Sequence, residues 1–266
     1  MPLFQLVLLA LVQGLTEFLP VSSSAHLILT PIAAGLEDQS PLIDVMAHVG
    51  SLIAVLVYFW RDIAEIVHGK LAWLSGRMTA GGRLALLVGV ATPPTIIAAG
   101  ALYLTGNTEL FRSPLVIGIA TLVFAVPLWA ADRFGRTVET TDTLGLRHAF
   151  LIGLVQVFAL IPGASRSGVT MTAGRALGMT RKESARFSML MAIPVIAAFG
   201  LVAGLDLARG TDSNANLGDG LIVAALSFVS ALAAIAVMMR FVERVGFLPF
   251  VLYRIALAGM IFWLLV

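Results

Sequence analysis

Two short polar segments interrupt otherwise hydrophobic sequence, and both carry side chains that can bind an anion and act on it. The first runs Gln13-Gly14-Leu15-Thr16-Glu17-Phe18-Leu19-Pro20-Val21-Ser22-Ser23-Ser24-Ala25-His26, and the second runs Pro162-Gly163-Ala164-Ser165-Arg166-Ser167-Gly168. At the middle of a bilayer each charged group would cost about 2.5–3.5 kcal/mol, so these groups should pair with each other or with a polar ligand. We interpret the two segments as one active site.

The second segment has the composition of an anion-binding turn. Gly163, directly after a proline, breaks a helix, and a new helix begins after Ser165, which leaves backbone N–H groups unpaired at its start. Ser165 and Ser167 add hydroxyls, and Arg166 adds a guanidinium that can bind a phosphate through two parallel hydrogen bonds. The segment therefore predicts a phosphate site. The alternative is a structural Arg166 that caps carbonyl groups or pairs with Glu17.

In the first segment, Gln13 and Glu17 are four residues apart, so on a helix they share one face. A divalent cation or Arg166 would favour the ionised carboxylate, which makes Glu17 a candidate metal ligand or a group that orients water. Mg²⁺ or Ca²⁺ is the cation expected at such an oxygen donor. The alternative is a neutral Glu17 that forms hydrogen bonds within a helix interface.

The hydroxyls of Ser22, Ser23 and Ser24 follow a proline, where they can surround phosphate oxygens or simply cap a helix. His26 lies three residues beyond Ser23, so it could act as a general base towards that hydroxyl or towards water, or accept the phosphoryl group itself. The nucleophile is therefore Ser23, His26 or water. Asp44 and His48, also four residues apart, are a secondary candidate for a supporting pair or a helix-interface hydrogen bond.

Composition identifies the class of protein that must position these groups. Of the 266 residues, 59% are hydrophobic and 12% are charged, and the mean hydropathy is +0.98, beyond what a soluble core requires. Residues 1–266 are therefore expected to form a single polytopic membrane domain. The net charge of +2 comes from basic residues dispersed at the ends of apolar runs, which argues against nucleic-acid binding. With no cysteine, disulfides and thiolate metal sites are excluded.

Six apolar runs are long enough to cross a bilayer as helices: residues 42–60, 84–104, 114–131, 187–205, 220–239 and 247–266. The stretches 3–35 and 149–177 are each broken near the middle, and each arm is shorter than the roughly 20 residues that a crossing needs. Both stretches are therefore predicted to be re-entrant helical hairpins. The expected fold class is an all-α integral membrane protein with six transmembrane helices and two re-entrant hairpins.

The positive-inside rule predicts an amino terminus outside the cell. That orientation leaves only Arg112 and Arg209 outside, while Arg166 and Arg254 are embedded. It places the other basic residues inside: Arg61, Lys70, Arg77, Arg83, Arg133, Arg136, Arg147, Arg175, Arg181, Lys182, Arg186, Arg240 and Arg244.

Each half of the chain is a hairpin followed by three spans, which predicts an inverted-topology repeat with copies at about 1–131 and 146–266. Leu11-Val12-Gln13 with Pro20 and Ser23 matches Leu154-Val155-Gln156 with Pro162 and Ser165 when one residue of slippage is allowed. In such a repeat the two hairpin tips approach from opposite faces. Residues 17–26 should therefore lie beside residues 162–168.

The two polar segments resemble the signatures of the bacterial undecaprenyl-diphosphate phosphatases of the bacitracin-resistance type, and the resemblance extends over essentially the whole chain. It implies a multi-pass protein of the bacterial inner (cytoplasmic) membrane, surrounded by membrane lipids. The implied activity is removal of the terminal phosphate from a polyprenyl diphosphate lipid. This recycles the carrier for cell-wall synthesis and confers bacitracin resistance. A homodimer is one option for the oligomeric state.

The resemblance also implies roles for single residues. Glu17 matches the family's acidic motif residue, His26 its histidine, Ser22 and Ser23 its serines, and Ser165 with Arg166 its phosphate-binding signature. We expect Glu17, Ser23, His26 and Arg166 to be catalytic. Where many relatives have a first acid, this chain has Gln13, which makes a metal site with two carboxylates doubtful and leaves one carboxylate for a divalent cation. The competing interpretation is a polyprenyl-phosphate or anion transporter or flippase that uses the same midplane site.

Overall fold

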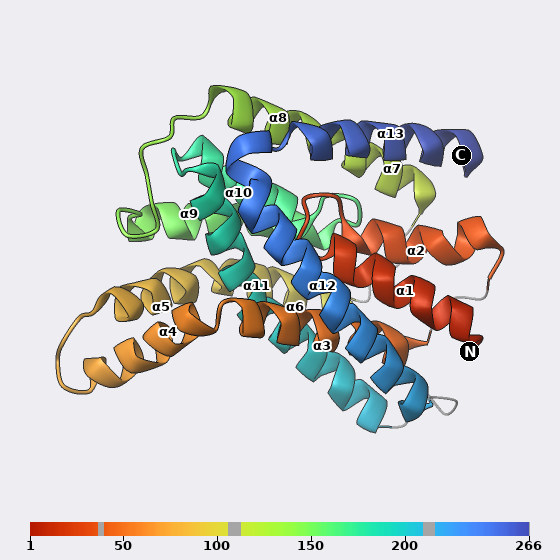
Figure 1. Cartoon of the computed structure of the whole chain (residues 1–266), viewed down its shortest axis with the longest axis horizontal. Coiled ribbons are helices and arrows are strands. Elements are labelled where there is room, and N and C mark those ends of the chain that lie inside the picture. The colour runs from red at the N-terminus through yellow and green to blue at the C-terminus, as the bar shows by residue number, and fades with distance from the viewer. Residues whose placement is uncertain (37–39, 106–112, 210–215, 266) are drawn as a thin grey trace.

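The computed structural model describes residues 1–36, 40–105, 113–209 and 216–265, and their regular secondary structure is helical (Figure 1). Arg112 and residue 266, the end of the last predicted span, lie outside these ranges. The first half contains α1 (Leu3–Thr16), α2 (Ser23–Ala34), α3 (Pro41–Tyr58), α4 (Trp60–Trp73), α5 (Ala80–Ala91), α6 (Pro93–Thr105), α7 (Pro114–Val123) and α8 (Ala125–Phe134). The second contains α9 (Leu146–Gln156), the short η2 (Val157–Leu160), α10 (Arg166–Ala176), α11 (Arg181–Ala208), α12 (Leu217–Val245) and α13 (Leu248–Leu264).

The predicted spans coincide with apolar helices, so the protein is an all-α membrane protein. Among the described residues, 5 helical segments are long and apolar enough to cross a bilayer: Pro41–Tyr58, Ala80–Thr105, Pro114–Phe134, Arg181–Leu207 and Leu217–Val245. The sixth predicted span is the shorter apolar helix Leu248–Leu264. That all six cross the membrane while the hairpins re-enter it stays a prediction.

Residues 60–73 form a helix, α4, between two predicted spans, where hydrophobic length predicts only a connection. It is amphipathic and carries charged residues, so it gives no spanning signal. It packs closely on α5: a Cβ atom on Gly69 would lie 2.0 Å from the backbone nitrogen of Gly82. These glycines let the two backbones approach, as small residues do at helix interfaces in membranes.

The two hairpins point towards each other. In Figure 1, α1 and α2 extend from their tip to the right-hand end of the molecule, where both termini lie, while α9 approaches from the left. Both hairpins break where proline or glycine interrupts the helix: Pro20 in the first, and Gly163, at φ +95°, in the second. This arrangement agrees with the prediction that the tips come from opposite sides.

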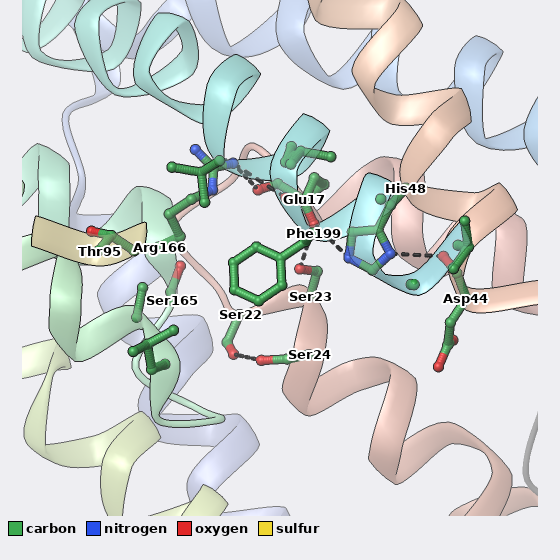
Figure 2. Close-up of a pocket in the computed structure, with 17 residues that line it drawn as sticks. Glu17, Ser22, Ser23, Ser24, Asp44, His48, Thr95, Ser165, Arg166 and Phe199 are labelled. Atoms are coloured by element: carbon green, nitrogen blue, oxygen red, sulfur yellow. Dashed lines mark hydrogen bonds and ion pairs between the residues drawn. The ribbon is translucent and has the colours of Figure 1, made fainter. Parts of the chain in front are cut away.

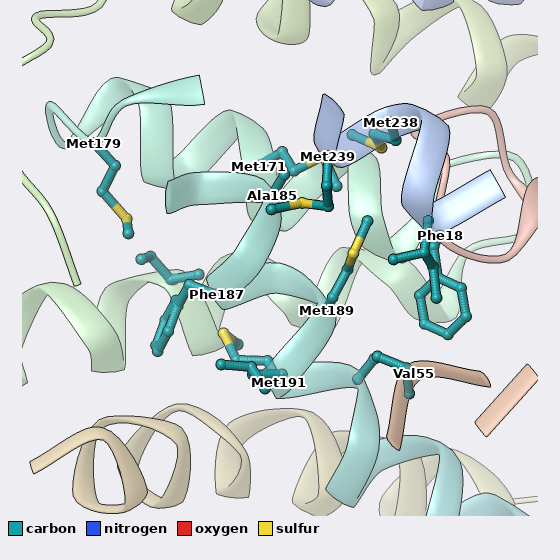
Figure 3. Packing of buried hydrophobic residues seen from close by; sticks show 14 of the residues in the cluster. Phe18, Val55, Met171, Met179, Ala185, Phe187, Met189, Met191, Met238 and Met239 are labelled. Carbon is teal, nitrogen blue, oxygen red and sulfur yellow. The ribbon is translucent and has the colours of Figure 1, made fainter. Parts of the chain in front are cut away.

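Methionine side chains fill much of the interior between the second hairpin and the long helices. Figure 3 shows Met171, Met189 and Met239 among the buried residues of α10, α11 and α12. The flexible thioether side chain fits irregular gaps between helices. These residues therefore form a packed core that supports the second hairpin from behind.

At Gly14, α1 packs closely against α12. A Cβ atom there would lie 1.9 Å from Oγ of Ser230 and 2.6 Å from the carbonyl oxygen of Ser227, so the helices would have to separate. We expect Gly14→Ala to destabilise the fold by about 1–3 kcal/mol, as overpacking does, and to lower the melting temperature in detergent. Gly89→Ala on α5, where a Cβ would meet nothing within 4 Å, is the control and should not lower it. Equal melting temperatures for the two variants would contradict the close packing.

Candidate active site

At the tip of each hairpin, a serine is the N-cap of the second helix. Ser22 (φ 74°) accepts a hydrogen bond from the backbone N–H of Ala25, and Ser165 (φ 71°) accepts one from that of Gly168. Positive φ is costly for residues other than glycine, so the surrounding contacts must hold both turns. The shared geometry pairs Ser165 with Ser22, in the same register as Gln156 with Gln13. The predicted pairing of Ser165 with Ser23, which needed slippage, is therefore wrong.

The two tips contact each other directly, which confirms the prediction that residues 17–26 lie beside residues 162–168. The backbone N–H of Gly163 donates to Oγ of Ser22 at 3.1 Å, and the hydroxyl of Ser167 donates to the carbonyl oxygen of Leu19 at 2.7 Å. In addition, the Arg166 guanidinium pairs with Glu17. The two halves of the chain therefore contribute to one cluster.

Glu17 is the centre of this cluster and is only 7% exposed. Its Oε2 accepts hydrogen bonds from the Gln13 amide at 2.9 Å and from the Ser23 hydroxyl at 2.7 Å. Its Oε1 accepts from Nη2 of Arg166 at 3.2 Å. The expectation that Gln13 and Glu17 share a helix face is confirmed. A buried carboxylate with these donors is held in one orientation, with the Ser23 proton pointing at it.

A cavity of about 400 Å³ opens over this cluster (Figure 2). Its polar wall includes the predicted residues Glu17, Ser22, Ser23, Ser24, Ser165 and Arg166. The opposite wall is largely apolar, and comes from η2 and the second half of α11, where the Phe199 ring faces the serines and Arg166. The cavity therefore joins an anion-binding end to a hydrophobic surface, as an amphipathic lipid would require.

Several predicted site residues lie behind the cavity wall. Gln13 donates to Glu17, while Gly163 and Ser167 donate to the first tip, at Ser22 and Leu19. Among the serines that do line the cavity, the hydroxyls of Ser22 and Ser24 lie 3.2 Å apart, and that of Ser165 lies 3.1 Å from the Ser167 hydroxyl behind the wall. These residues shape the turns, and direct contact with a substrate stays a prediction for them.

His26 is not among the residues that line the cavity. Its Nδ1 lies 2.7 Å from the carbonyl oxygen of Ser22, which can only accept, so Nδ1 carries the hydrogen. Its Nε2 lies 2.6 Å from the Tyr253 hydroxyl, and the imidazole and phenol rings are stacked. In this arrangement His26 holds the strained Ser22 turn, and a role as base for Ser23 stays a prediction.

His48 is the histidine that faces the cavity, and sequence reasoning had given it only a secondary place. Its Nδ1 lies 2.8 Å from the backbone carbonyl oxygen of Asp44, which leaves Nε2 directed at Oε2 of Glu17, 3.8 Å away. The spacing of Asp44 and His48 was the available signal. Spacing within one segment does not show that α3 packs beside the first tip, so it does not predict the contact between His48 and Glu17.

Oxygen atoms suited to a hard divalent cation are present near Glu17. The described residues contain no group of three His, Cys, Asp or Glu side chains that could hold a metal ion. However, Oε1 of the buried Gln13 has no hydrogen-bond partner, and the amide nitrogen of the same side chain donates to the Glu17 carboxylate. Mg²⁺ and Ca²⁺ prefer such oxygen ligands and complete their shells with water or phosphate. The donor set therefore fits a cation that is held partly by a substrate.

The sequence is similar to those of known proteins. Residues 6–260 match the family model described as bacitracin resistance protein BacA. A protein of Maricaulis maris (strain MCS10) named undecaprenyl-diphosphatase is 66% identical over 259 residues, which cover 97% of each chain. Proteins of the same name from Ruegeria pomeroyi (52% identical, covering 97% of this chain and 96% of the relative) and Alcanivorax borkumensis (46% identical, covering 98% of each) are also similar.

Proposed function

This chain belongs to the bacitracin resistance protein BacA family, and we propose that it hydrolyses undecaprenyl diphosphate to undecaprenyl phosphate and inorganic phosphate. The observation that carries this proposal is the hydrogen bond that the Ser23 hydroxyl donates to Glu17. Arg166 lies on the other side of this carboxylate, and the cavity that they line has one apolar wall. This hydrolysis would recycle the lipid carrier for cell-wall synthesis and confer bacitracin resistance. The site of action would be the bacterial inner membrane. A homodimer stays a prediction.

In the proposed first step, Oγ of Ser23 attacks the terminal phosphorus while Glu17 takes its proton. The bond from that phosphorus to the bridging oxygen breaks, and undecaprenyl phosphate leaves. Glu17 passes that proton to the leaving phosphate and is ionised again. In the second step water attacks the phosphoserine while Glu17 accepts its proton, the bond from phosphorus to Oγ of Ser23 breaks, and Glu17 returns the proton to Oγ as inorganic phosphate is released. The 2.7 Å hydrogen bond between Ser23 and Glu17 supports this assignment of nucleophile and base.

Arg166 would bind the diphosphate and stabilise the charge of the transferred phosphoryl group. It begins α10, and the first turn of that helix adds backbone N–H groups and the Ser165 hydroxyl on the same side. Gln13 and Glu17 would hold a divalent cation. When bound, this cation would neutralise charge on the diphosphate.

The transporter interpretation needs a binding site but no activated nucleophile. The Ser23–Glu17 hydrogen bond therefore favours hydrolysis. The names of the relatives, which extend over nearly the whole chain, favour it as well.

The direct test is phosphate release from undecaprenyl diphosphate by the purified full-length protein in detergent. We expect release that depends on Mg²⁺ or Ca²⁺, stops with a chelator, and is lost in Glu17→Gln. Release unchanged by the chelator would remove the cation from the proposal. Absence of release from a folded wild-type protein that still binds the lipid would overturn the proposal in favour of transport.

His48 should contribute less than the residues in contact with the phosphates. We expect His48→Leu to lower kcat/KM about tenfold, because it removes the polar side chain whose Nε2 lies 3.8 Å from Oε2 of Glu17, a longer and weaker contact than a hydrogen bond. His48→Gln, which keeps a polar side chain in this place, should lose less. Steady-state kinetics of the two variants measure the difference, and a wild-type rate for His48→Leu would show that the residue does not act on Glu17.

A further inference from the structure

Arg254 of α13 is a fully buried charge that the proposed chemistry does not use. Its side chain is 0% exposed. No ion pair with a carboxylate is found for it in the described part of the chain, and its contacts are to backbone carbonyl oxygens. A buried guanidinium without a counter-charge is costly, so its retention requires a reason.

The five acceptors of Arg254 come from three parts of the fold. They are the carbonyl oxygens of Pro20 at 3.3 Å, Gly163 at 2.9 Å, Ala164 at 3.1 Å, Ala120 at 3.5 Å and Thr121 at 3.1 Å. The first belongs to the tip of the first hairpin, the next two belong to the tip of the second, and the last two lie near the end of α7. One guanidinium therefore joins both tips to the helix behind them, and donates to carbonyl groups at the two helix breaks.

Arg254 also lies directly behind the start of α10. A Cβ atom on Gly168 would be 3.3 Å from its Nη1, a tight contact that the guanidinium could relieve only by shifting slightly. The charge of Arg166 is offset by Glu17, whereas that of Arg254 has no acidic partner among the described residues. Its positive charge is therefore left to attract an anion bound on the other side of the turn.

We propose that Arg254 is a positioning residue for the diphosphate site, which fixes the spacing of the two hairpin tips and supplies an uncompensated positive charge behind the phosphate-binding turn. This inference rests on the proposed function for its substrate. Its two parts are separable, because charge and hydrogen-bonding geometry can be changed independently. Lysine keeps the charge, but its compact ammonium group cannot reach carbonyls of three elements, and glutamine loses the charge.

The charge is tested by binding of inorganic diphosphate to the full-length protein, followed as a rise in melting temperature, a readout that needs no turnover. We expect the apparent Kd for diphosphate to rise about tenfold in Arg254→Gln, since removal of a nearby unit positive charge weakens binding of the anion. In Arg254→Lys it should stay near the wild-type value. An unchanged Kd in Arg254→Gln would overturn the electrostatic part.

The spacing is tested with spin labels on the hairpins. The chain has no cysteine, so Ile32→Cys on α2 and Ala176→Cys on α10, both exposed, carry the only labels. We expect the distance distribution to broaden in both Arg254→Lys and Arg254→Gln, and kcat to fall in both. An unchanged distribution in Arg254→Lys would overturn the positioning part, even if Arg254→Gln does not fold.

Arg175→Gln is the matched control. Arg175 is also buried, at 3% exposed, and donates to backbone carbonyls, but it lies at the other end of α10 and pairs with Asp132. We expect this variant to melt at a lower temperature with unchanged Kd and label distances. If it shifts both as Arg254→Gln does, general loosening explains the effects and the inference fails. Diphosphate binding without phosphate release by the wild type would refute only the proposed hydrolysis.

Discussion

Replacing Ser23 with alanine is expected to lower phosphate release from undecaprenyl diphosphate by about a thousandfold or more, because it removes the group that would form the covalent intermediate. The expectation follows from the direction of the Ser23 proton, which is donated to Oε2 of Glu17 over 2.7 Å. Of the three cavity-lining serines of the first tip, only Ser23 is bonded to the carboxylate. Ser22 and Ser24 contact each other.

The measurement is steady-state turnover of the purified variant, together with acid quenching of the wild-type reaction on substrate labelled in its terminal phosphate. Label should be retained on wild-type protein and be absent from Ser23→Ala. Ser24→Ala is the matched control, because it removes a neighbouring hydroxyl that does not contact Glu17, and it should lose no more than about tenfold. Near-normal turnover of Ser23→Ala would make water or His26 the nucleophile.

Arg166→Ala should reduce kcat/KM by about a thousandfold, because it removes the charged donor from the phosphate site and leaves Glu17 without its ion-pair partner. Loss of one member of a buried pair also costs about 3–5 kcal/mol of stability, so the melting temperature should fall. Arg166→Lys should recover part of the stability and little of the activity, since an ammonium group cannot form the two parallel bonds.

Activity, melting temperature and binding of inorganic diphosphate together separate these effects. Arg209→Ala is the control: Arg209 is 73% exposed and pairs with Asp206 three residues earlier on the helix surface. Surface pairs of this kind contribute about 0–1 kcal/mol, so neither stability nor turnover should change measurably. If Arg166→Ala binds diphosphate as tightly as the wild type, the phosphate site lies elsewhere in the cavity.

Much of the fold follows from hydrophobic length alone. The runs that became α3, α11 and α12 are continuous apolar stretches, and backbone hydrogen bonding in a bilayer leaves them no alternative to a helix. The hairpins were recognisable because each has a break between arms too short to span. The amphipathic α4 was not predicted, since its charged residues interrupt the apolar run and leave no spanning signal.

The candidate site was predictable where the free-energy cost of burying a charge requires a contact. Glu17 and Arg166 are 149 residues apart, yet the expense of burying either charge alone predicts their pairing, and the structure shows it. The position of His26 three residues after Ser23 carried no such constraint. Nε2 of His26 lies at hydrogen-bond distance from the hydroxyl of Tyr253, near the end of the chain. The imidazole that lies close to Glu17 is that of His48.

The sequence by itself determined that this protein is an all-α membrane protein with two broken helices whose polar residues meet, because charge and hydrophobic length act locally and admit few solutions. Only the tertiary structure decided which atoms meet. Ser23 rather than Ser22 reaches Glu17, His48 rather than His26 faces the cavity, and Arg254 lies behind both tips. These outcomes depend on the packing of helices that are distant in the chain, and residue spacing within one segment does not encode it.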